Sequence, residues 1–286
     1  MRALMDRQRV IWTTTLTLAL ALTVTARAAD AMKYPDWSGQ WLHTGVGGQF
    51  DPSKPPRLGQ HPPLTPEYQA IWEANLKEAD EGGQNYNPQA HCLPGGMPRL
   101  MMALEPMEFI VTPNTTYVET TFNSEFRRIY TDGRDWPTTK VPPSFSGYSI
   151  GKWIDQDGDG RYDALEVETR GLRGPRHFDS SGIPMHRDNQ TVIKERFYPD
   201  KSDANVIYDE ITTIDHALTR PWAVTRGYRR SNTSNTAVWI ENTCLESNQY
   251  VFIGGESYLV SVDGFLMPVR KNEPPPNLRN FTDVSK

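Results

Sequence analysis

From Met107 onward, short runs of β-branched and aromatic residues alternate with clusters of turn residues such as Asp132-Gly133 and Ser231-Asn232. Such a pattern is typical of successive β-strands. The predicted strands are Glu108–Thr112, Thr116–Phe122, Phe126–Thr131, Gly147–Ile154, Ala164–Gly171, Gln190–Tyr198, Asn205–Thr213, Trp222–Arg230, Ala237–Glu241 and Gln249–Gly254. Short strands at this spacing predict an all-β fold, an antiparallel sandwich or barrel.

The predicted strands do not separate apolar from polar residues cleanly. In Phe126–Tyr130, Val192–Tyr198 and Asn205–Ile211, both alternating faces mix apolar with charged or strongly polar residues. Whichever face points inward, some of these groups point inward with it. A barrel with a polar lumen for a ligand needs this, and a small dry barrel does not. The same mixture would also arise from a strand register different from the predicted one, or from long side chains that reach solvent at strand ends.

One short helix is predicted ahead of the strands. Thr65 suits the N-cap, Pro66 the first helical position and Glu67 the first turn, and Gly82-Gly83 would end the helix. Its apolar stripe, which predicts packing rather than a ligand site, consists of Tyr68, Ile71, Trp72 and Leu76. The Pro-rich segment 52–66 predicts an irregular surface loop.

A second loop rich in Gly and Pro is predicted over residues 91–102. It lacks the lysine and the helix that follow a phosphate-binding loop, so that function is discounted. We expect a loop that is fixed by a disulfide and lines a pocket with Met101 and Met102.

The first 28 residues have the pattern of a secretory signal peptide. Arg2, Arg7 and Arg9 form a basic start, residues 11–25 form a short apolar stretch, and Ala26-Arg27-Ala28 is a cleavage site. The apolar stretch is short for a membrane span. The sequence therefore predicts export to the periplasm or beyond the cell, with residues 29–286 as a single β-barrel domain.

Charge limits the class of partner. The chain has 30 Lys and Arg against 35 Asp and Glu, a formal charge of −5; the leader holds four arginines and one aspartate, so its removal leaves about −8. An acidic exported protein is a poor match for nucleic acid or an anionic membrane surface.

Cys92 and Cys244 are the only cysteines. In an oxidising compartment two cysteines most simply pair. The bridge would close a loop of about 150 residues and stabilise the fold by about 4–5 kcal/mol in the chain-entropy model. The alternative is a free reactive thiol.

The segment Asp155–Glu166 fits D-x-D-x-D-G-x-x-D-x-x-E and resembles the calcium loop of EF-hand proteins over these residues alone. The ligands would be the carboxylates of Asp155, Asp157, Asp159 and Asp163, the backbone carbonyl of Arg161 and both carboxylate oxygens of Glu166. Gly160 permits the sharp turn. Both flanks have strand patterns, so we predict a structural calcium ion in a strand–loop–strand hairpin. An acidic hairpin tip without an ion is the alternative.

The candidate chemistry lies in loops. No histidine belongs to a close zinc motif, and no serine-nucleophile turn is predicted, since Gly147–Gly151 lies in a predicted strand. The densest polar stretch is the long loop 173–189, and Asp215-His216 lies in a later loop that could converge on it. Histidines beside carboxylates can transfer protons, and an arginine can hold a carboxylate or an enolate. The candidate catalytic residues are His177, His186, His216, Arg196, Asp188 and Asp215. For any single histidine the alternative is an ordinary solvated loop residue.

Several segments together resemble a family of exported bacterial proteins of uncharacterised function. They are Trp37–Trp41, Cys92–Arg99, Arg127–Arg134, Gly147–Trp153, Lys194–Tyr198, Arg220–Trp222 and Asn242–Glu246. The first contains Gly39-Gln40-Trp41, the Gly-x-Trp pattern of lipocalins. The resemblance implies a lipocalin-like (calycin-type) barrel and brings no activity or catalytic residue. The calcium-type hairpin resembles one branch of the family only.

Three functions are compatible with these observations. The first is a barrel that binds or processes a small, partly apolar ligand or substrate, as a carrier or through cofactor-free acid/base chemistry (a lyase, isomerase or hydrolase). The second is a non-catalytic module for envelope interaction or polysaccharide binding, which predicts an exposed aromatic patch. The third is a calcium sensor, which predicts a large change of shape with calcium.

Overall fold

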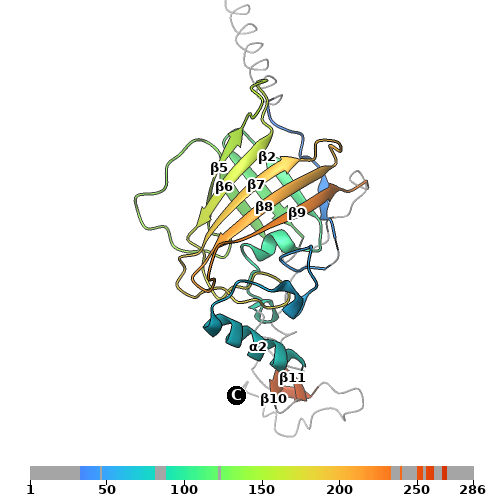
Figure 1. The fold of residues 1–286 in the computed structure, drawn as a ribbon, viewed down its shortest axis with the longest axis vertical. Coiled ribbons are helices and arrows are strands. Elements are labelled where there is room, and N and C mark those ends of the chain that lie inside the picture. Colours follow the sequence, from blue (N-terminus) through green and yellow to red (C-terminus); the bar gives the residue numbers. More distant parts are fainter. Residues whose placement is uncertain are drawn as a thin grey trace, which may run out of the picture.

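The computed structural model describes residues 33–232 apart from residues 46, 81–87 and 122–123, together with residue 239 and three C-terminal strands. Its centre is a closed barrel of nine strands (Figure 1). In chain order these are β1 Gln40–His43, β2 Met107–Val111, β3 Thr115–Thr120, β4 Phe126–Tyr130, β5 Tyr148–Ile154, β6 Ala164–Arg170, β7 Val192–Pro199, β8 Val206–Ile214 and β9 Trp222–Arg230. The predicted all-β barrel is confirmed, and the strands predicted between Glu108 and Arg230 correspond to β2–β9.

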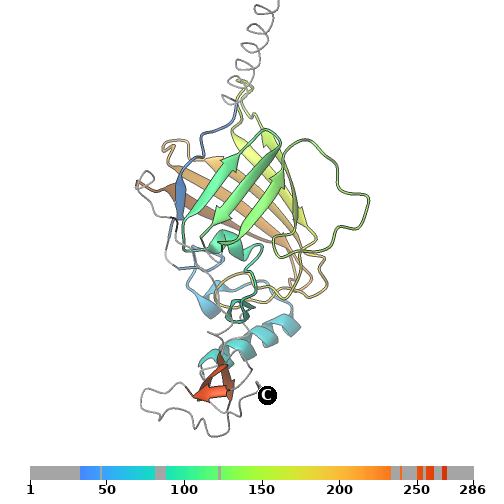
Figure 2. The same ribbon diagram turned by 180° about the vertical axis from the view of Figure 1, so that it is seen from behind.

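The barrel closes through its shortest strand, β1. This strand pairs with β2 on one side and β9 on the other, both antiparallel. Every neighbouring pair is antiparallel except β4 and β5, which run parallel with Ile129 opposite Ser149. A parallel pair needs a long crossover, and residues 131–147 provide it by running along the outside of the barrel (Figure 2). The expectation of a fully antiparallel barrel is therefore wrong at this one pair.

Helical segments and loops cover one end of the barrel, opposite the tip of the β5–β6 hairpin (Figure 1). The segments are η1 Arg57–Gln60, α2 Pro66–Asp80, η2 Pro88–His91 and η3 Arg99–Met102. The predicted helix start is confirmed, because the N–H of Tyr68 donates to Oγ1 of Thr65 at 3.4 Å. The Trp72 indole N–H donates to the carbonyl of Ser181 at 2.9 Å, which fastens α2 to a loop of the barrel.

The interior of the barrel is apolar at both ends and charged in the middle. Trp37, Phe109 and Phe197 fill the end near the β5–β6 hairpin, and Phe50, Phe178 and Trp222 pack together at the loop-covered end. Between them lie the buried side chains of Arg127, Glu195, Asp209, Arg226 and Tyr228. The prediction that charged groups point inward is confirmed.

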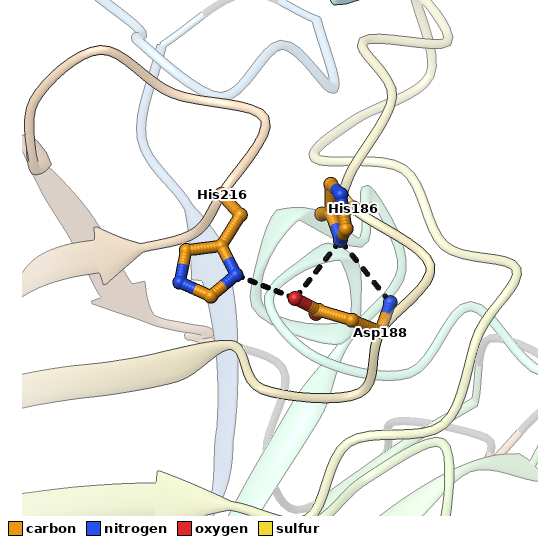
Figure 3. Close-up of side chains that lie close together, drawn as sticks. All are labelled: His186, Asp188 and His216. Carbon is orange, nitrogen blue, oxygen red and sulfur yellow. Dashed lines mark hydrogen bonds and ion pairs between the residues drawn. The ribbon is translucent and has the colours of Figure 1, made fainter.

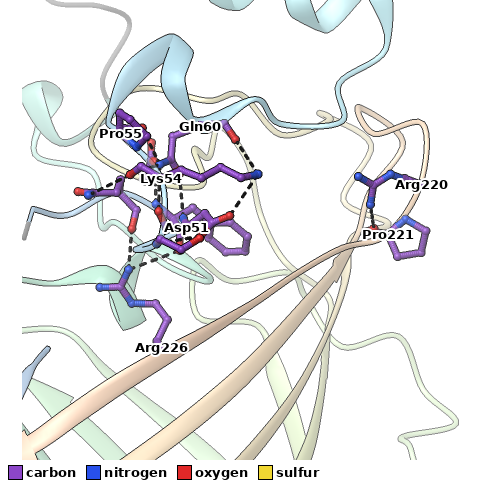
Figure 4. A network of polar contacts seen from close by, with 11 residues as sticks. Asp51, Lys54, Pro55, Gln60, Arg220, Pro221 and Arg226 are labelled. Atoms are coloured by element: carbon purple, nitrogen blue, oxygen red, sulfur yellow. Dashed lines mark hydrogen bonds and ion pairs between the residues drawn. The ribbon is translucent and has the colours of Figure 1, made fainter. Parts of the chain in front are cut away.

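At the loop-covered end, a hydrogen-bond network surrounds the buried side chain of Gln60 (Figure 4). Gln60 accepts the N–H of Asp51 at 2.8 Å and donates to the carbonyls of Asp51 and Pro55 at 3.0 and 2.9 Å. The segment that this network orders also contacts Arg226, whose Nη1 donates to the carbonyl of Gln49 at 2.6 Å.

The loop rich in Gly and Pro binds a side-chain carboxylate, that of Glu125. The N–H groups of Gly95 and Gly96 donate to the two carboxylate oxygens of buried Glu125, at 2.5 and 2.8 Å. Gly96 has φ of +60°, and a Cβ there would lie 2.4 Å from the carbonyl oxygen of Phe145, so only glycine fits. Met101 and Met102 are buried core residues.

The remaining predictions concern the chain ends. β10 Tyr250–Ile253, β11 Glu256–Val260 and β12 Leu266–Pro268 form a separate sheet, so the predicted strand Gln249–Gly254 is not a barrel strand. The leader, Cys244 and nearly all of the predicted strand Ala237–Glu241 lie outside the described residues. Within the part that is described, no helix has the length and hydropathy of a membrane span.

Candidate functional site

A cleft of about 1080 Å³ separates α2 from the loop 174–189. Its apolar walls include Ile71, Ala74, Leu93, Pro184 and Met185. Four polar side chains of the loop also line it: Arg176, His177, Arg187 and Asn189. A concave, mostly apolar cavity with a few polar groups is the usual form of a small-molecule site.

The loop is held by its own carboxylate, Asp179. Oδ1 of Asp179 accepts the N–H and the hydroxyl of Ser181, at 2.9 and 2.6 Å, and Oδ2 accepts the N–H of Phe50 at 2.8 Å. His177 and Pro184 form an antiparallel bridge across the turn. These contacts tie the loop to itself and to Phe50, although the loop contains neither helix nor strand.

Arg176 is a buried cation with spare hydrogen-bonding capacity. Its side chain is 3% exposed, and Nη2 donates to Oγ1 of Thr191 at 2.7 Å. Nε and Nη1 have no partner among the described residues. Burial lowers the pKa of Arg176 to about 10, so the group stays charged at neutral pH. Buried charged donors normally have acceptors, so this arginine is a candidate binding group for an anion. Both nitrogens, Nε and Nη1, are buried, so a ligand reaches them only if neighbouring cleft side chains move.

His177 is a buried neutral imidazole. Burial, together with the positive charge of Arg99, lowers the pKa of His177 to about 4. Its Nδ1 has no hydrogen-bond partner within the described part of the chain. The cleft therefore presents a cation and a neutral imidazole side by side in an apolar setting.

His186, Asp188 and His216 form a second cluster (Figure 3). Oδ2 of Asp188 lies 3.0 Å from Nδ1 of His186 and 2.5 Å from Nδ1 of His216. Burial alone would raise the pKa of Asp188, but hydrogen bonds from the Gln190 N–H and from both histidines lower it to about 2. The donor atoms of the three side chains all lie within 4.8 Å of one another, so the cluster could hold a metal ion.

Asp215 holds together the two loops that carry this cluster. Its carboxylate accepts the N–H groups of His186 and Ala217 at 2.9 and 2.8 Å, and the hydroxyl of Thr191 at 2.5 Å. Asp215 is buried and does not line the cleft. It is a positioning residue, and the structure does not place it to act on a ligand.

Arg196 does not join the other predicted catalytic residues. It lies on β7, where Nη2 donates to the side-chain carbonyl of Gln156 at 2.8 Å and Nε lies 3.9 Å from Glu166. Its contacts are thus with the β5–β6 hairpin. The other five, His177, His186, Asp188, Asp215 and His216, lie in the loops that precede β7 and follow β8.

The acidic segment 155–166 forms the predicted strand–loop–strand hairpin. Asp155, Asp157 and Asp159 bring carboxylate oxygens within 4.8 Å of one another, as a calcium site requires. Asp163 accepts the N–H of Gln156 at 2.7 Å, and Arg161 lies in the loop. Glu166 lies on β6, opposite Lys152 and Arg196 on the neighbouring strands. Calcium binding itself remains a prediction.

The charged centre of the barrel was not singled out from the sequence. Arg127 donates to both carboxylate oxygens of Glu195, at 2.7 and 2.8 Å. Asp209 has no hydrogen-bond partner among the described residues, nor do Nε and Nη2 of Arg226. Burial, together with the charge of Glu195, raises the pKa of Asp209 well above its usual range. The mixed strand faces predict that some charged side chains point into the barrel. They do not predict which of these side chains form pairs.

The chain matches no family model and no curated protein. A proposal for its function therefore depends on the geometry of the candidate site. The fold and the cleft define a capped β-barrel with a candidate ligand site outside its lumen.

Proposed function

We propose that the protein binds a small amphiphilic anion, a carboxylate with an apolar body, in the cleft between α2 and residues 174–189. The observation that carries the proposal is Arg176, a buried cation on the cleft wall with two nitrogens that lack partners in the described chain. The apolar walls suit the body of the ligand, and the volume of about 1080 Å³ suits a small organic molecule.

Binding is better supported than proton abstraction. A general base works best when its pKa is near the pH of the reaction. With a pKa of about 4, the His177 imidazole is free to accept a proton at neutral pH but holds it weakly. A lyase, isomerase or hydrolase that uses His177 would need the bound anion to raise this pKa. A carrier, by contrast, needs only a neutral hydrogen-bonding group beside the cation.

The test is calorimetric titration of the mature protein with decanoate, and with decanol as the uncharged analogue. We expect decanoate to bind more tightly than decanol. Arg176→Leu should weaken decanoate binding by about tenfold to a hundredfold, since a hydrogen bond to a charged group contributes about 1.5–3 kcal/mol. Arg176→Lys, which keeps the charge, should retain part of the preference.

The matched control is Arg187→Leu. Arg187 also lines the cleft but is exposed, so solvent screens its charge, and its loss should change affinity by less than about fivefold. Equal losses in the two leucine variants, or equal affinity for decanoate and decanol, would contradict the proposal.

The interaction module has no comparable support. Its hallmark would be an exposed aromatic patch. The large hydrophobic side chains exposed in the described part of the chain are Leu42, Leu58, Ile71, Leu104, Ile110, Phe126, Val141 and Ile214. Only one of them is aromatic, and none is a tryptophan. We therefore propose no second function.

Two features of the setting are proposals as well. We propose that the loop 155–166 binds a structural calcium ion, supported by the convergence of Asp155, Asp157 and Asp159. We also propose export and a Cys92–Cys244 disulfide, supported by the leader pattern and by the presence of only two cysteines.

A further inference from the structure

We propose that His186, Asp188 and His216 bind a divalent transition metal of the zinc class. The site goes beyond the proposed carboxylate-binding function. Two imidazole nitrogens and one carboxylate oxygen converge, with all three donor atoms within 4.8 Å of one another (Figure 3). Imidazole and carboxylate together are typical ligands of zinc and its neighbours, whereas calcium prefers oxygen alone.

Nδ1 of His186 faces the carboxylate of Asp188, as two ligands of one metal would. The backbone N–H of Asp188 lies 3.2 Å from Nδ1 of His186 and holds the ring in the cluster. Oδ2 of Asp188 lies 3.0 Å from the same nitrogen. A proton can join these two atoms, and a divalent metal that displaces it would bind both.

The cluster is also positioned in advance. β7 and β8 pair directly beneath it, with Val192 opposite Ile214, so the loops before β7 and after β8 leave the barrel side by side. Asp215 then bonds to the backbone on both loops, at His186 and Ala217. The ring of Tyr68 packs against the His186 ring with centroids 5.4 Å apart. Supported ligands of this kind lose little freedom when a metal binds.

Solvent can supply the remaining coordination position. The side chain of His216 is 63% exposed and that of His186 33%. Zinc ligands lie about 2.0–2.2 Å from the metal, so the 2.5 Å between Nδ1 of His216 and Oδ2 of Asp188 must widen on binding. Because His216 is exposed, its ring can move outward without disturbing the core.

The cluster and the cleft adjoin each other at the turn 185–189 and at the ring of Tyr68, which lines the cleft and packs on His186. Met185, Arg187 and Asn189 line the cleft, whereas His186 and Asp188, which alternate with them, do not. None of the three proposed metal ligands lines the cleft, so zinc and decanoate titrations of the same variants distinguish the two proposals. Asp188 interacts electrostatically with Arg176, so Asp188→Asn can change decanoate affinity as well, and His216→Ala is the cleaner variant.

The experiment is calorimetric titration of the chelator-treated mature protein with zinc chloride. We expect one zinc ion per chain. Asp188→Asn and His216→Ala should each weaken binding by at least about a hundredfold, because loss of even an outer-shell partner costs about 10–100-fold. Asparagine retains an oxygen that can accept the Gln190 N–H, and His216 is exposed, so both variants should fold. Cobalt titration adds a second readout, visible absorption bands that both variants should lose.

The calcium-type loop supplies the matched control. Asp157→Asn removes an exposed carboxylate from the other candidate metal cluster and should leave zinc affinity unchanged. Equal zinc affinity in the wild type and both cluster variants would overturn the proposal. So would a loss of zinc binding in Asp157→Asn, or in His177→Gln, with the cluster variants unaffected.

Discussion

Glu195 and Asp209 are two carboxyl groups buried inside the barrel in different electrostatic surroundings. Glu195 accepts two hydrogen bonds from the guanidinium of Arg127, whereas Asp209 has no hydrogen-bond partner among the described residues. Burial and the nearby charge of Glu195 raise the pKa of Asp209. Arg127 is thus hydrogen-bonded to Glu195 and not to Asp209, and burial favours the protonated form of Asp209.

This difference predicts unequal effects of amide substitutions. Glu195→Gln leaves the Arg127 charge unpaired in the core and should lower the free energy of unfolding by about 3–5 kcal/mol. Asp209→Asn replaces one neutral group with another and should change it by less than about 1.5 kcal/mol. Urea denaturation at neutral pH measures both.

An exposed pair provides the control for the buried one. Glu168 and Arg170 form an ion pair on β6 with side chains 26% and 52% exposed. Glu168→Gln should cost less than about 1 kcal/mol, because exposed pairs are screened. A cost for Asp209→Asn as large as that for Glu195→Gln would show that Asp209 is ionised in the folded protein.

His177 predicts a pH dependence of stability. Its pKa in the folded chain, about 4, is below the ordinary value of 6.5 because of burial and the charge of Arg99. Between these values the unfolded chain binds a proton that the folded chain does not. Stability from this group is therefore lost as the pH falls from about 6.5 to about 4, at about 1.4 kcal/mol per pH unit.

The comparison is between wild type and His177→Gln in urea denaturation at a series of pH values. Burial raises the pKa of the carboxyl groups of Asp179 and Glu125 toward this range, so only the difference between the two slopes reports His177. The variant should lose less stability on acidification than the wild type. Parallel profiles would show that His177 does not titrate in this way.

At the scale of elements, the β5–β6 hairpin shows what the sequence could predict. Its acidic loop and its strand-like flanks are local patterns, and the hairpin was predicted correctly. The parallel pairing of β4 with β5 was not, because a strand pattern does not specify its neighbour. The position of Arg196 was missed for a related reason. Alternation on β7 sends Glu195 inward and Arg196 outward, and only the sheet register decides which.

Calcium should stabilise the same hairpin. Gly158 and Gly160 have φ of +76° and +88°, and their N–H groups donate to the two carboxylate oxygens of Asp155 at 2.7 and 3.0 Å, so the turn is already formed. At a calcium concentration of about 100 times Kd, the ion should raise the free energy of unfolding by about 2.7 kcal/mol. Asp157→Asn should abolish most of this gain. Denaturation with calcium or with a chelator measures it, and a gain that survives in the variant would place the ion elsewhere.

At the scale of the whole molecule, the site could be predicted only in part. His177, His186, Asp188 and His216 were chosen because polar residues gather in long loops, and the pairing of β7 with β8 brings those loops together. The cleft could not be predicted, because it depends on how α2 packs against the loop 174–189. The mixed strand faces favoured a site in the lumen. The structure instead fills the lumen with Arg127, Arg226, Tyr228 and aromatic rings.

This arrangement predicts that calcium and the cleft ligand act independently. The calcium-type loop is at one end of the barrel, and α2 with the cleft is at the other (Figure 1). In the described chain the hairpin strands β5 and β6 make their main contacts with β4 and β7, not with α2. Calcium should therefore raise stability through the whole cooperative fold but change decanoate affinity by less than about twofold, as expected for distant sites that share no partner.

The sensor hypothesis predicts the opposite. A sensor requires coupling between the sites, typically about 1–3 kcal/mol or about 5–150-fold in affinity, and a calcium loop usually achieves it by opening a pair of helices. Here the loop joins two strands that pair over their whole length, from Tyr148 opposite Arg170 to Ile154 opposite Ala164, and they belong to a closed barrel. Decanoate titration with calcium and with a chelator decides between them. A shift beyond about fivefold would show that the barrel transmits the signal and that calcium regulates the site.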